Sequence, residues 1–322
     1  MRKLAPPLML LTLGGCAGRQ AMLGAAGRDS ALFAWLWHVF LIVTVAFYCI
    51  VIAGLLWAVV RRREGGEAAV RTGLLVWVAL ISLTLVGLTL ASWLADRNMN
   101  RAPRTGLTIE ITAHQWWWDV RYIASDPSMT LRTSNELHLP AGTPVRIVLK
   151  SADVIHSFWI PNLSGKQDLI PGRSNDIVVT PEKVGVYRSQ CAEYCGVQHA
   201  HMAFDVTVQP REAFEQWWKA GLLPAHAPAT SVEQAGYTYV TTRECSTCHN
   251  VTGTPASGQV APDLTHFASR LSIGAGTYPM DRGHLAAWLA DPQDAKPGNK
   301  MPVIGLEPAE LRAVSAYLES LK

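Results

Sequence analysis

The chain has little charge of either sign. Charged residues make up 16% of its 322 residues, and the formal net charge is only +3, with a pI near 8.5. Nucleic-acid-binding domains carry a strongly basic face, so this balance predicts no nucleic-acid partner. In contrast, 49% of the residues are hydrophobic and twelve are tryptophan, a composition that leans towards membrane proteins. The length allows two or three domains.

The first apolar run is too short to span a membrane. The chain begins MRKLAPPLMLLTLGGCAGRQ, a basic start, a short apolar run and then small residues, which is typical of a secretory signal. Residues 13–16 resemble the lipobox of bacterial lipoproteins, in which cleavage precedes an acylated cysteine. This resemblance implies a signal peptide over 1–15, a bacterial source and a lipid-anchored Cys16 outside the cytoplasm. A conventional signal cut nearby and an uncleaved amphipathic start are the alternatives.

Two long stretches lack charged side chains, apart from the potentially charged His38. About 20 apolar residues suffice to cross a bilayer, so the sequence predicts transmembrane helices at about 31–60 and 72–95, within a hairpin over 16–103. Arg61, Arg62 and Arg63 lie between them, and such a block marks the cytoplasmic side. Both termini are then expected on the periplasmic side of a bacterial inner membrane. Core helices of a soluble domain are the poorer alternative, because the runs are long, adjacent and joined by arginines.

Period-two alternation follows the hairpin. Leu107, Ile109, Ile111 and Ala113 would share one face of a strand, which is then half-buried. Similar short apolar segments recur at 145–149, 177–179 and 204–208, separated by turn residues. Many short strands with such turns indicate a sandwich or barrel, which we expect over 104–210.

A cluster of possible metal ligands lies within this region. Residues 191–202 read CAEYCGVQHAHM and place Cys191, Cys195, His199 and Met202 in one short loop. Soft sulfur combined with imidazole nitrogen selects copper over magnesium, calcium or manganese. A disulfide between the two cysteines and a zinc site are the alternatives. Met202 counts against both, since zinc sites use Cys, His and carboxylate.

This loop resembles subunit II of the haem-copper cytochrome c oxidases, which carries the binuclear copper centre called CuA. The resemblance implies a cupredoxin-like fold. Spacing cannot rank His114, His138 and His156 as the second imidazole, but residues 153–158 look like the upstream ligand segment of the family. The implied copper set is His156, Cys191, Glu193 through its backbone carbonyl, Cys195, His199 and Met202. The Glu193 carboxylate would face a magnesium ion shared with subunit I, and His201 matches no ligand.

Three consecutive tryptophans, 116–118, follow Gln115. Because neighbouring side chains in a strand point to opposite faces, at least one of these rings should be exposed or at an interface. Ordinary core packing is the alternative. The family resemblance places an exposed aromatic residue here, at the point where electrons enter the copper site, and Trp116 aligns with it.

A second set of motifs follows a helix and a Pro/Ala linker over 211–230. Cys245, Cys248 and His249 form the C-x-x-C-H pattern of covalent c-type haem attachment. Residues 231–322 resemble class I cytochromes c, which implies Met301 as the distal ligand, with Met280 as competitor. Pro262 resembles the proline whose carbonyl accepts the N–H of the proximal histidine. An apolar stripe at Leu311, Val314, Leu318 and Leu321 indicates a closing amphipathic helix.

Together these regions resemble the fused subunit II of caa-type oxidases. The expected fold is a two-helix transmembrane hairpin, an all-β cupredoxin-like barrel and an all-α cytochrome c domain. The resemblance implies electron relay from cytochrome c or the chain's own haem c to CuA, and on to haem a of subunit I. Oxygen reduction coupled to proton translocation would occur on subunit I. Expected partners are subunits I and III, and cytochrome c or an upstream respiratory complex.

Two other functions share these motifs. One is a membrane-tethered electron carrier or copper-handling protein, and the other is a subunit of a CuA-type nitric oxide reductase. The chain also departs from the family, because residues 72–95 lack the glutamate and proline that accompany the second span in many relatives. Glu67 precedes the span, but the motif does not carry the proton-uptake role onto it.

Overall fold

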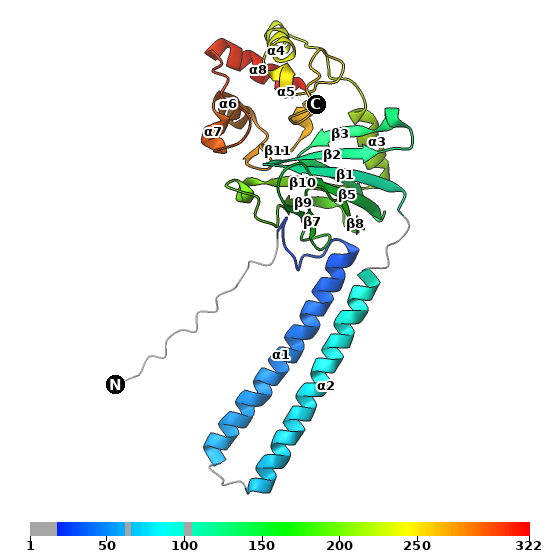
Figure 1. Ribbon diagram of the computed structural model, residues 1–322, viewed down its shortest axis with the longest axis vertical. Helices are drawn as coiled ribbons and strands as arrows, with labels where there is room; N and C mark the ends of the chain where they lie inside the picture. Colours follow the sequence, from blue (N-terminus) through cyan, green and yellow to red (C-terminus); the bar gives the residue numbers. More distant parts are fainter. Residues whose placement is uncertain (1–17, 62–65, 100–104) are drawn as a thin grey trace, which may run out of the picture.

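The computed structural model describes residues 18–61, 66–99 and 105–322. The expected signal peptide, Cys16, Arg62 and Arg63 lie outside the described residues. Figure 1 shows a long helical hairpin, a β domain next to it and a helical domain on the far side of the β domain. This order of a membrane-type hairpin, a sheet-rich domain and a helical domain confirms the expected fold class.

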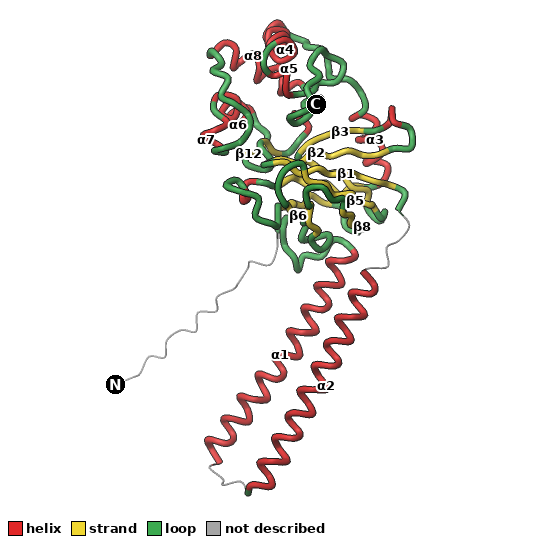
Figure 2. The backbone as a smooth tube through the Cα atoms, in the orientation of Figure 1, coloured by secondary structure: helices red, strands yellow, loops and turns green. Residues whose placement is uncertain are grey.

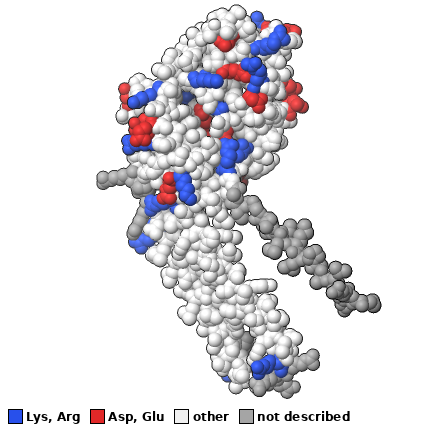
Figure 3. Space-filling model, turned by 180° about the vertical axis from the view of Figure 1, so that it is seen from behind, with Lys and Arg blue, Asp and Glu red and all other residues white. Residues whose placement is uncertain are grey.

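The hairpin consists of α1 (Arg28–Arg61) and α2 (Glu67–Met99). Both helices are long and apolar enough to cross a membrane, and Figure 3 shows their middle part free of Lys, Arg, Asp and Glu. They extend beyond the expected spans at both ends, because polar residues outside the apolar stretch continue the helical hydrogen bonding. Their large apolar side chains face outward, as lipid-facing residues would. The hairpin fits a membrane-anchored subunit.

The β domain contains two main sheets. One has the order β3-β2-β1-β5-β8, the second the order β4-β10-β9, and β6 pairs with β7. The strands are β1 (Leu107–His114), β2 (Trp117–Ile123), β3 (Leu131–Ser134), β4 (Glu136–Pro140), β5 (Val145–Ser151), β6 (His156–Phe158), β7 (Gln167–Leu169), β8 (Asn175–Val179), β9 (Gly185–Gln190) and β10 (Ala203–Gln209). Two short 3-10 helices, η1 (Pro127–Met129) and η2 (His199–His201), lie in its loops.

The predicted alternation defines the core of the β domain. Ile109, Ile111 and Ala113 of β1 are fully buried, and they belong to one hydrophobic cluster with Phe204 and Val206 of β10. Apolar side chains at every second position keep one face of each sheet out of water. The cluster fills the space between the two sheets, and it includes residues of β10, which together with β9 flanks the predicted metal-binding loop, residues 191–202.

The sequence suggested that the three consecutive tryptophans lie in one strand, but only Trp117 and Trp118 do. Gln115 and Trp116 form the turn between β1 and β2, and β2 begins at Trp117. Trp118 is fully buried in the core, whereas Trp116 is half-buried beside it. The turn, rather than strand alternation, therefore directs Trp116 out of the core.

The helical domain follows α3 (Arg211–Gly221) and the linker at 222–230. It contains α4 (Ser231–Thr242), α5 (Cys245–Cys248), η3 (Phe267–Ser269), α6 (Arg282–Ala290), α7 (Pro292–Ala295) and α8 (Pro308–Ser320). Figure 2 shows these helices with long connecting loops. A short antiparallel pair, β11 (Ser272–Ile273) with β12 (Tyr278–Pro279), departs from the all-α expectation.

Two helices, α4 and α8, form the centre of this domain. They approach so closely at Gly236 that a Cβ atom there would lie 2.0 Å from the carbonyl oxygen of Ala313. Val314, Leu318 and Leu321 are buried, and Leu311 packs at the edge of the same cluster. The expected apolar stripe is therefore the face that closes the domain.

Candidate copper and haem sites

The predicted copper ligands converge at one end of the β domain. Cys191 Sγ lies 3.7 Å from Cys195 Sγ and 3.9 Å from Nδ1 of His156. Cys195 Sγ lies 3.6 Å from Nδ1 of His199 and 3.8 Å from Sδ of Met202. Both cysteines are free thiols. Three sulfur atoms and two imidazoles thus meet in one place, although they come from separate segments.

Strand pairing explains this convergence. Cys191 directly follows β9, and Met202 directly precedes β10, which pairs with β9 in antiparallel register. The N–H of Cys191 donates to the carbonyl of Met202 at 2.9 Å and closes the base of the loop. His156 begins β6, and so arrives from a different part of the domain.

Burial gives the cluster its chemical character. His156, Cys191, Cys195 and Met202 are each at most 2% exposed. The hydrogen bond between the two thiols lowers the pKa of Cys191, and the contact with His156 acts in the same direction. That hydrogen bond and burial raise the pKa of Cys195. A buried donor set of soft sulfur and imidazole fits copper, and the residues present therefore suit such a centre.

A carboxylate supports the imidazole of His156. Asp153 Oδ1 lies 2.8 Å from His156 Nε2, and Oδ2 accepts the backbone N–H of Gln115 at 2.7 Å. Burial acts to raise the pKa of Asp153, but hydrogen bonds from His156 and from backbone N–H groups outweigh it and lower this pKa to about 2. Such contacts orient a metal-binding histidine and set its tautomer. The sequence motif contained Asp153 without assigning it this role.

Other predicted positions lie at different distances from the cluster. The carbonyl oxygen of Glu193 is 3.2 Å from Cys191 Sγ, and its carboxylate accepts the N–H of Tyr194. His201 is exposed. Two upstream histidines are engaged elsewhere: His114 stacks on Trp117, and His138 stacks on Trp217. Among the described residues, His156 is the upstream histidine that joins the two cysteines.

The predicted haem residues line a second feature, a partly open cavity of about 450 Å³ between the helical domain and the β domain. Cys245, Cys248, His249 and Met301 all contribute to its wall. Burial lowers the pKa of His249, and its Nδ1 lies 2.7 Å from the carbonyl of Pro262, as the motif predicts. Met280 packs on the hydrophobic cluster but is absent from the residues that line the cavity. The two cysteines, an imidazole and a thioether around one cavity fit a covalently attached haem.

The β domain supplies part of the wall of this cavity. Gln115, Trp116 and Trp117 line it together with the helical-domain residues. The side chains of Gln115 and Trp116 also donate to the carbonyl of Cys195, at 2.7 and 2.9 Å. One turn therefore lies between the two candidate cofactor sites, at Trp116, where the family resemblance implies that electrons enter the copper site.

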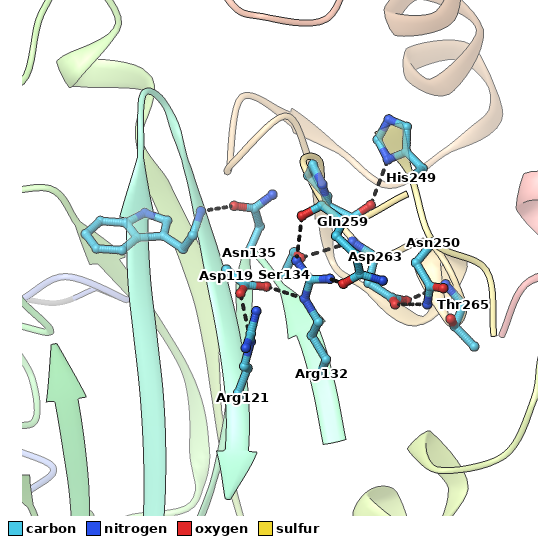
Figure 4. A network of polar contacts seen from close by, with 12 residues as sticks. Asp119, Arg121, Arg132, Ser134, Asn135, His249, Asn250, Gln259, Asp263 and Thr265 are labelled. Atoms are coloured by element: carbon cyan, nitrogen blue, oxygen red, sulfur yellow. Dashed lines mark hydrogen bonds and ion pairs between the residues drawn. The ribbon is translucent and has the colours of Figure 1, made fainter. Parts of the chain in front are cut away.

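Polar contacts join the two domains along β2, β3 and β4. Figure 4 shows Arg132 of β3 placed between Asp119 and Gln259, and the N–H of Asp263 donates to Oγ of Ser134 at 3.3 Å. A buried ion pair adds to them, with Nε of Arg270 3.7 Å from Oε1 of Glu136. The helical domain is thus packed against the β domain rather than held by the linker alone.

Family comparisons cover both domains. Residues 123–209 match the family described as cytochrome c oxidase subunit II, periplasmic domain, and residues 233–322 match cytochrome c. These families imply copper in the β domain and haem c in the helical domain. A crystal structure of the periplasmic domain of subunit II of cytochrome oxidase from Bradyrhizobium japonicum is similar to this chain with 30% sequence identity and a TM-score of 0.35, over 37% of this chain and 96% of that one.

Similarity to full-length relatives extends further. Cytochrome c oxidase subunit 2 of Bacillus sp. strain PS3 is 32% identical, over 81% of this chain and 80% of the relative. The same subunit of Alkalihalophilus pseudofirmus is 29% identical, over 98% of this chain and 96% of the relative. Because this similarity runs through the hairpin, the β domain and the helical domain alike, the chain belongs to the cytochrome c oxidase subunit II family, in the form that carries a C-terminal cytochrome c domain.

Proposed function

We propose that this chain relays electrons from its own helical domain to its β domain, and from there to haem a of subunit I in a proton-translocating oxidase. The observation that carries the proposal is the position of Trp116. Its ring lines the haem-type cavity, and its indole N–H donates to the carbonyl of Cys195, a candidate copper ligand. A single side chain therefore connects the two sites.

The residues that the motifs identify would hold the cofactor of each site. Cys245 and Cys248 would attach haem c covalently, and His249 and Met301 would hold its iron. The copper centre would be held by Cys191, Cys195, His156, His199 and Met202, and by the carbonyl of Glu193. When bound, the two groups supply one-electron carriers whose potentials depend on these ligands. Trp116 and Trp117 line the haem-type cavity on the side of the β domain.

The position in the complex is part of the same proposal. The hairpin would cross a bacterial inner membrane and pack against subunit I, with subunit III completing the complex and both termini on the periplasmic side. Acylated Cys16 would add a second anchor. The carboxylate of Glu193 would contribute to a magnesium site at the contact with subunit I, and an external cytochrome c or an upstream respiratory complex would reduce the helical domain.

Isolation of the complex tests this assignment. The tagged chain, purified in mild detergent, should carry a large partner with haem a absorbance and should consume oxygen with reduced cytochrome c. Isolation of the chain alone, fully loaded and without a partner, would favour a tethered electron carrier instead. Reduction of nitric oxide without oxygen uptake would favour the reductase.

Rapid kinetics test the relay. Flash-induced or stopped-flow reduction of the Trp116→Ala chain should show slower haem c oxidation and copper reduction, with both cofactors still present. Trp93→Ala, in the exposed membrane hairpin, is a matched control that should leave this rate unchanged. A Trp116→Ala rate equal to that of the unaltered chain would exclude Trp116, and haem oxidation that depends on protein concentration would contradict transfer within one chain.

A further inference from the structure

Lys296 is a buried cation at the contact between the two domains. It directly follows α7 of the helical domain, and its exposure is only 2%. Lysine is among the side chains that are almost never fully buried without partners. Burial lowers the pKa of Lys296 to about 7, and the nearby Cys195 opposes this shift. A charged ammonium group in this buried position needs hydrogen-bond acceptors to stabilise it.

Three backbone carbonyls act as these acceptors. Nζ of Lys296 donates to the carbonyls of Trp116 at 2.8 Å, His201 at 2.6 Å and Gly274 at 2.8 Å. An ammonium group has three N–H donors, so each donor has one acceptor. The acceptors belong to three separate segments. These are the β1–β2 turn, the loop 191–202 that carries the candidate copper ligands (the copper-ligand loop), and a turn of the helical domain.

The segment that follows Lys296 also contacts the copper-ligand loop. The carbonyl of Pro297 accepts from the side chain of Gln198 at 2.7 Å. Nζ of Lys300 lies 3.7 Å from Oδ2 of Asp153, the carboxylate that supports His156. Met301 then lines the haem-type cavity. Residues 296–301 therefore join the distal side of one candidate cofactor site to the loop of the other.

We propose that Lys296 is the positioning residue that holds the helical domain in a single docked orientation, with Trp116 between the two sites. Truncation of this side chain would remove the side-chain donor of the carbonyls of Trp116 and His201, whereas the carbonyl of Gly274 would keep the hydroxyl of Thr277. Buried carbonyls without partners are costly, so the contact would open and admit water. The domains would then meet only as often as the linker brings them together.

This inference rests on the proposed function only where it concerns electron transfer, because docking itself can be measured separately. The N–H of Ala203 in β10 donates to the carbonyl of Ala275 in the helical domain at 2.9 Å. Amide hydrogen exchange of the peptide that contains Ala203 therefore reports contact between the domains, whether or not electrons pass.

The test compares Lys296→Met with the matched control Lys219→Met in the full chain loaded with haem and copper. Lys219 carries the same charge, but it is exposed on α3 and does not line either candidate site. Lys296→Met should increase exchange at Ala203 and slow transfer from haem to copper by roughly tenfold or more, with a rate that falls as solvent viscosity rises. Lys219→Met should change neither quantity.

Two further variants separate charge from geometry. Lys296→Gln keeps two N–H donors and should give an intermediate increase in exchange, and it also serves as the test if the Met variant fails to fold. Lys296→Arg keeps the positive charge near Cys195, but its N–H donors lie in one plane on three nitrogens and cannot be presented from a single atom to the three carbonyls. It should hold the copper reduction potential close to that of the unaltered chain while still loosening the contact, whereas Lys296→Met should lower that potential.

Each outcome bears on one idea. Unchanged exchange and unchanged rate in loaded Lys296→Met, or equal effects of Lys219→Met, would overturn the role of Lys296. Increased exchange in Lys296→Met, together with no transfer within the unaltered chain, would leave Lys296 as the docking residue and contradict the proposed relay.

Discussion

The two candidate cofactor sites differ in how much of the surrounding fold depends on them. Cys191, Cys195 and Met202 are members of the hydrophobic core of the β domain. In the helical domain, Cys245 and Met301 only pack at the edge of a smaller core, and a cavity of about 450 Å³ lies beside them. The copper-type site is built from residues that already pack together, whereas the haem-type site leaves a space that the cofactor would have to fill.

This difference follows from the secondary structure. Paired strands hold Cys191 and Met202 in register by backbone hydrogen bonds that need no metal. Loops hold Met301 and Pro262, and their positions depend on what they pack against. The β domain should therefore keep its fold without its cofactor, and the helical domain should not.

Removal of the haem attachment should have the largest effect. Without haem the cavity of about 450 Å³ is left unfilled, and the residues around it lose the packing contacts that the haem would supply. Because the total stability of a domain is only about 5–15 kcal/mol, such a loss can unfold it. The double variant Cys245→Ala/Cys248→Ala should leave the helical domain unfolded, as measured by hydrogen exchange of α4 and α8.

The matched variants are Cys191→Ser and Cys195→Ser. Each should abolish the purple mixed-valence spectrum of the copper centre, while the haem stays attached and β1 and β10 stay protected from exchange. Retention of two coppers per chain would contradict the ligand assignment, and loss of the β fold would contradict the comparison between the domains.

The buried ion pair between the domains should give the next largest effect. Glu136→Gln leaves Arg270 buried without its anionic partner, which typically costs about 3–5 kcal/mol. Thermal unfolding should show this loss, and Glu136→Gln/Arg270→Met should recover part of it. An unchanged melting temperature in the single variant would mean that the pair contributes nothing to the contact.

Acid should act on the same pair. Burial acts to raise the pKa of Glu136, but His138 and Arg270 outweigh it, so the pKa in the folded chain lies below its ordinary value. The contribution of this group to stability is then fully present above its unfolded pKa, near 4.5, and is lost as the pH falls through the folded pKa. Glu136→Gln should lack this part of the acid dependence of unfolding.

A substitution between α4 and α8 of the helical domain should destabilise the chain less than loss of the buried ion pair. Gly236→Ala places a Cβ atom against the backbone of Ala313 and forces α4 and α8 apart, which we expect to cost about 1–3 kcal/mol. Gly283→Ala, in α6, is the control because its Cβ would meet only a side-chain oxygen at 3.4 Å. It should be neutral or slightly stabilising. Equal destabilisation by both changes would indicate a backbone effect instead.

The smallest effect on folding is expected for Met301→Ala, although its effect on the haem should be clear. Covalent attachment would persist, but loss of the thioether ligand should lower the reduction potential. Met280→Ala should leave the potential unchanged, because Met280 does not line the cavity. An unaltered spectrum and potential in Met301→Ala would point to Met280 as the ligand.

The sequence by itself determined the elements and the chemistry of each site. Apolar runs, alternation and helical stripes arise from local side-chain patterns, and they predicted the hairpin, β1 and α8. The loop 191–202 and the C-x-x-C-H motif carry most of their ligands within a few residues. Local spacing was therefore enough to predict them, although His156, Glu193 and Met301 needed the family resemblance.

Only the tertiary structure decided how the two sites are related. Trp116 lies in a turn, Asp153 supports His156, and Lys296 reaches carbonyls 95 and 180 residues away. These contacts depend on how two domains pack, and no periodicity within either segment encodes the partner on the other. A buried lysine at the end of a short helix looks like a solvated residue in the sequence, because its acceptors are backbone carbonyls that every residue possesses.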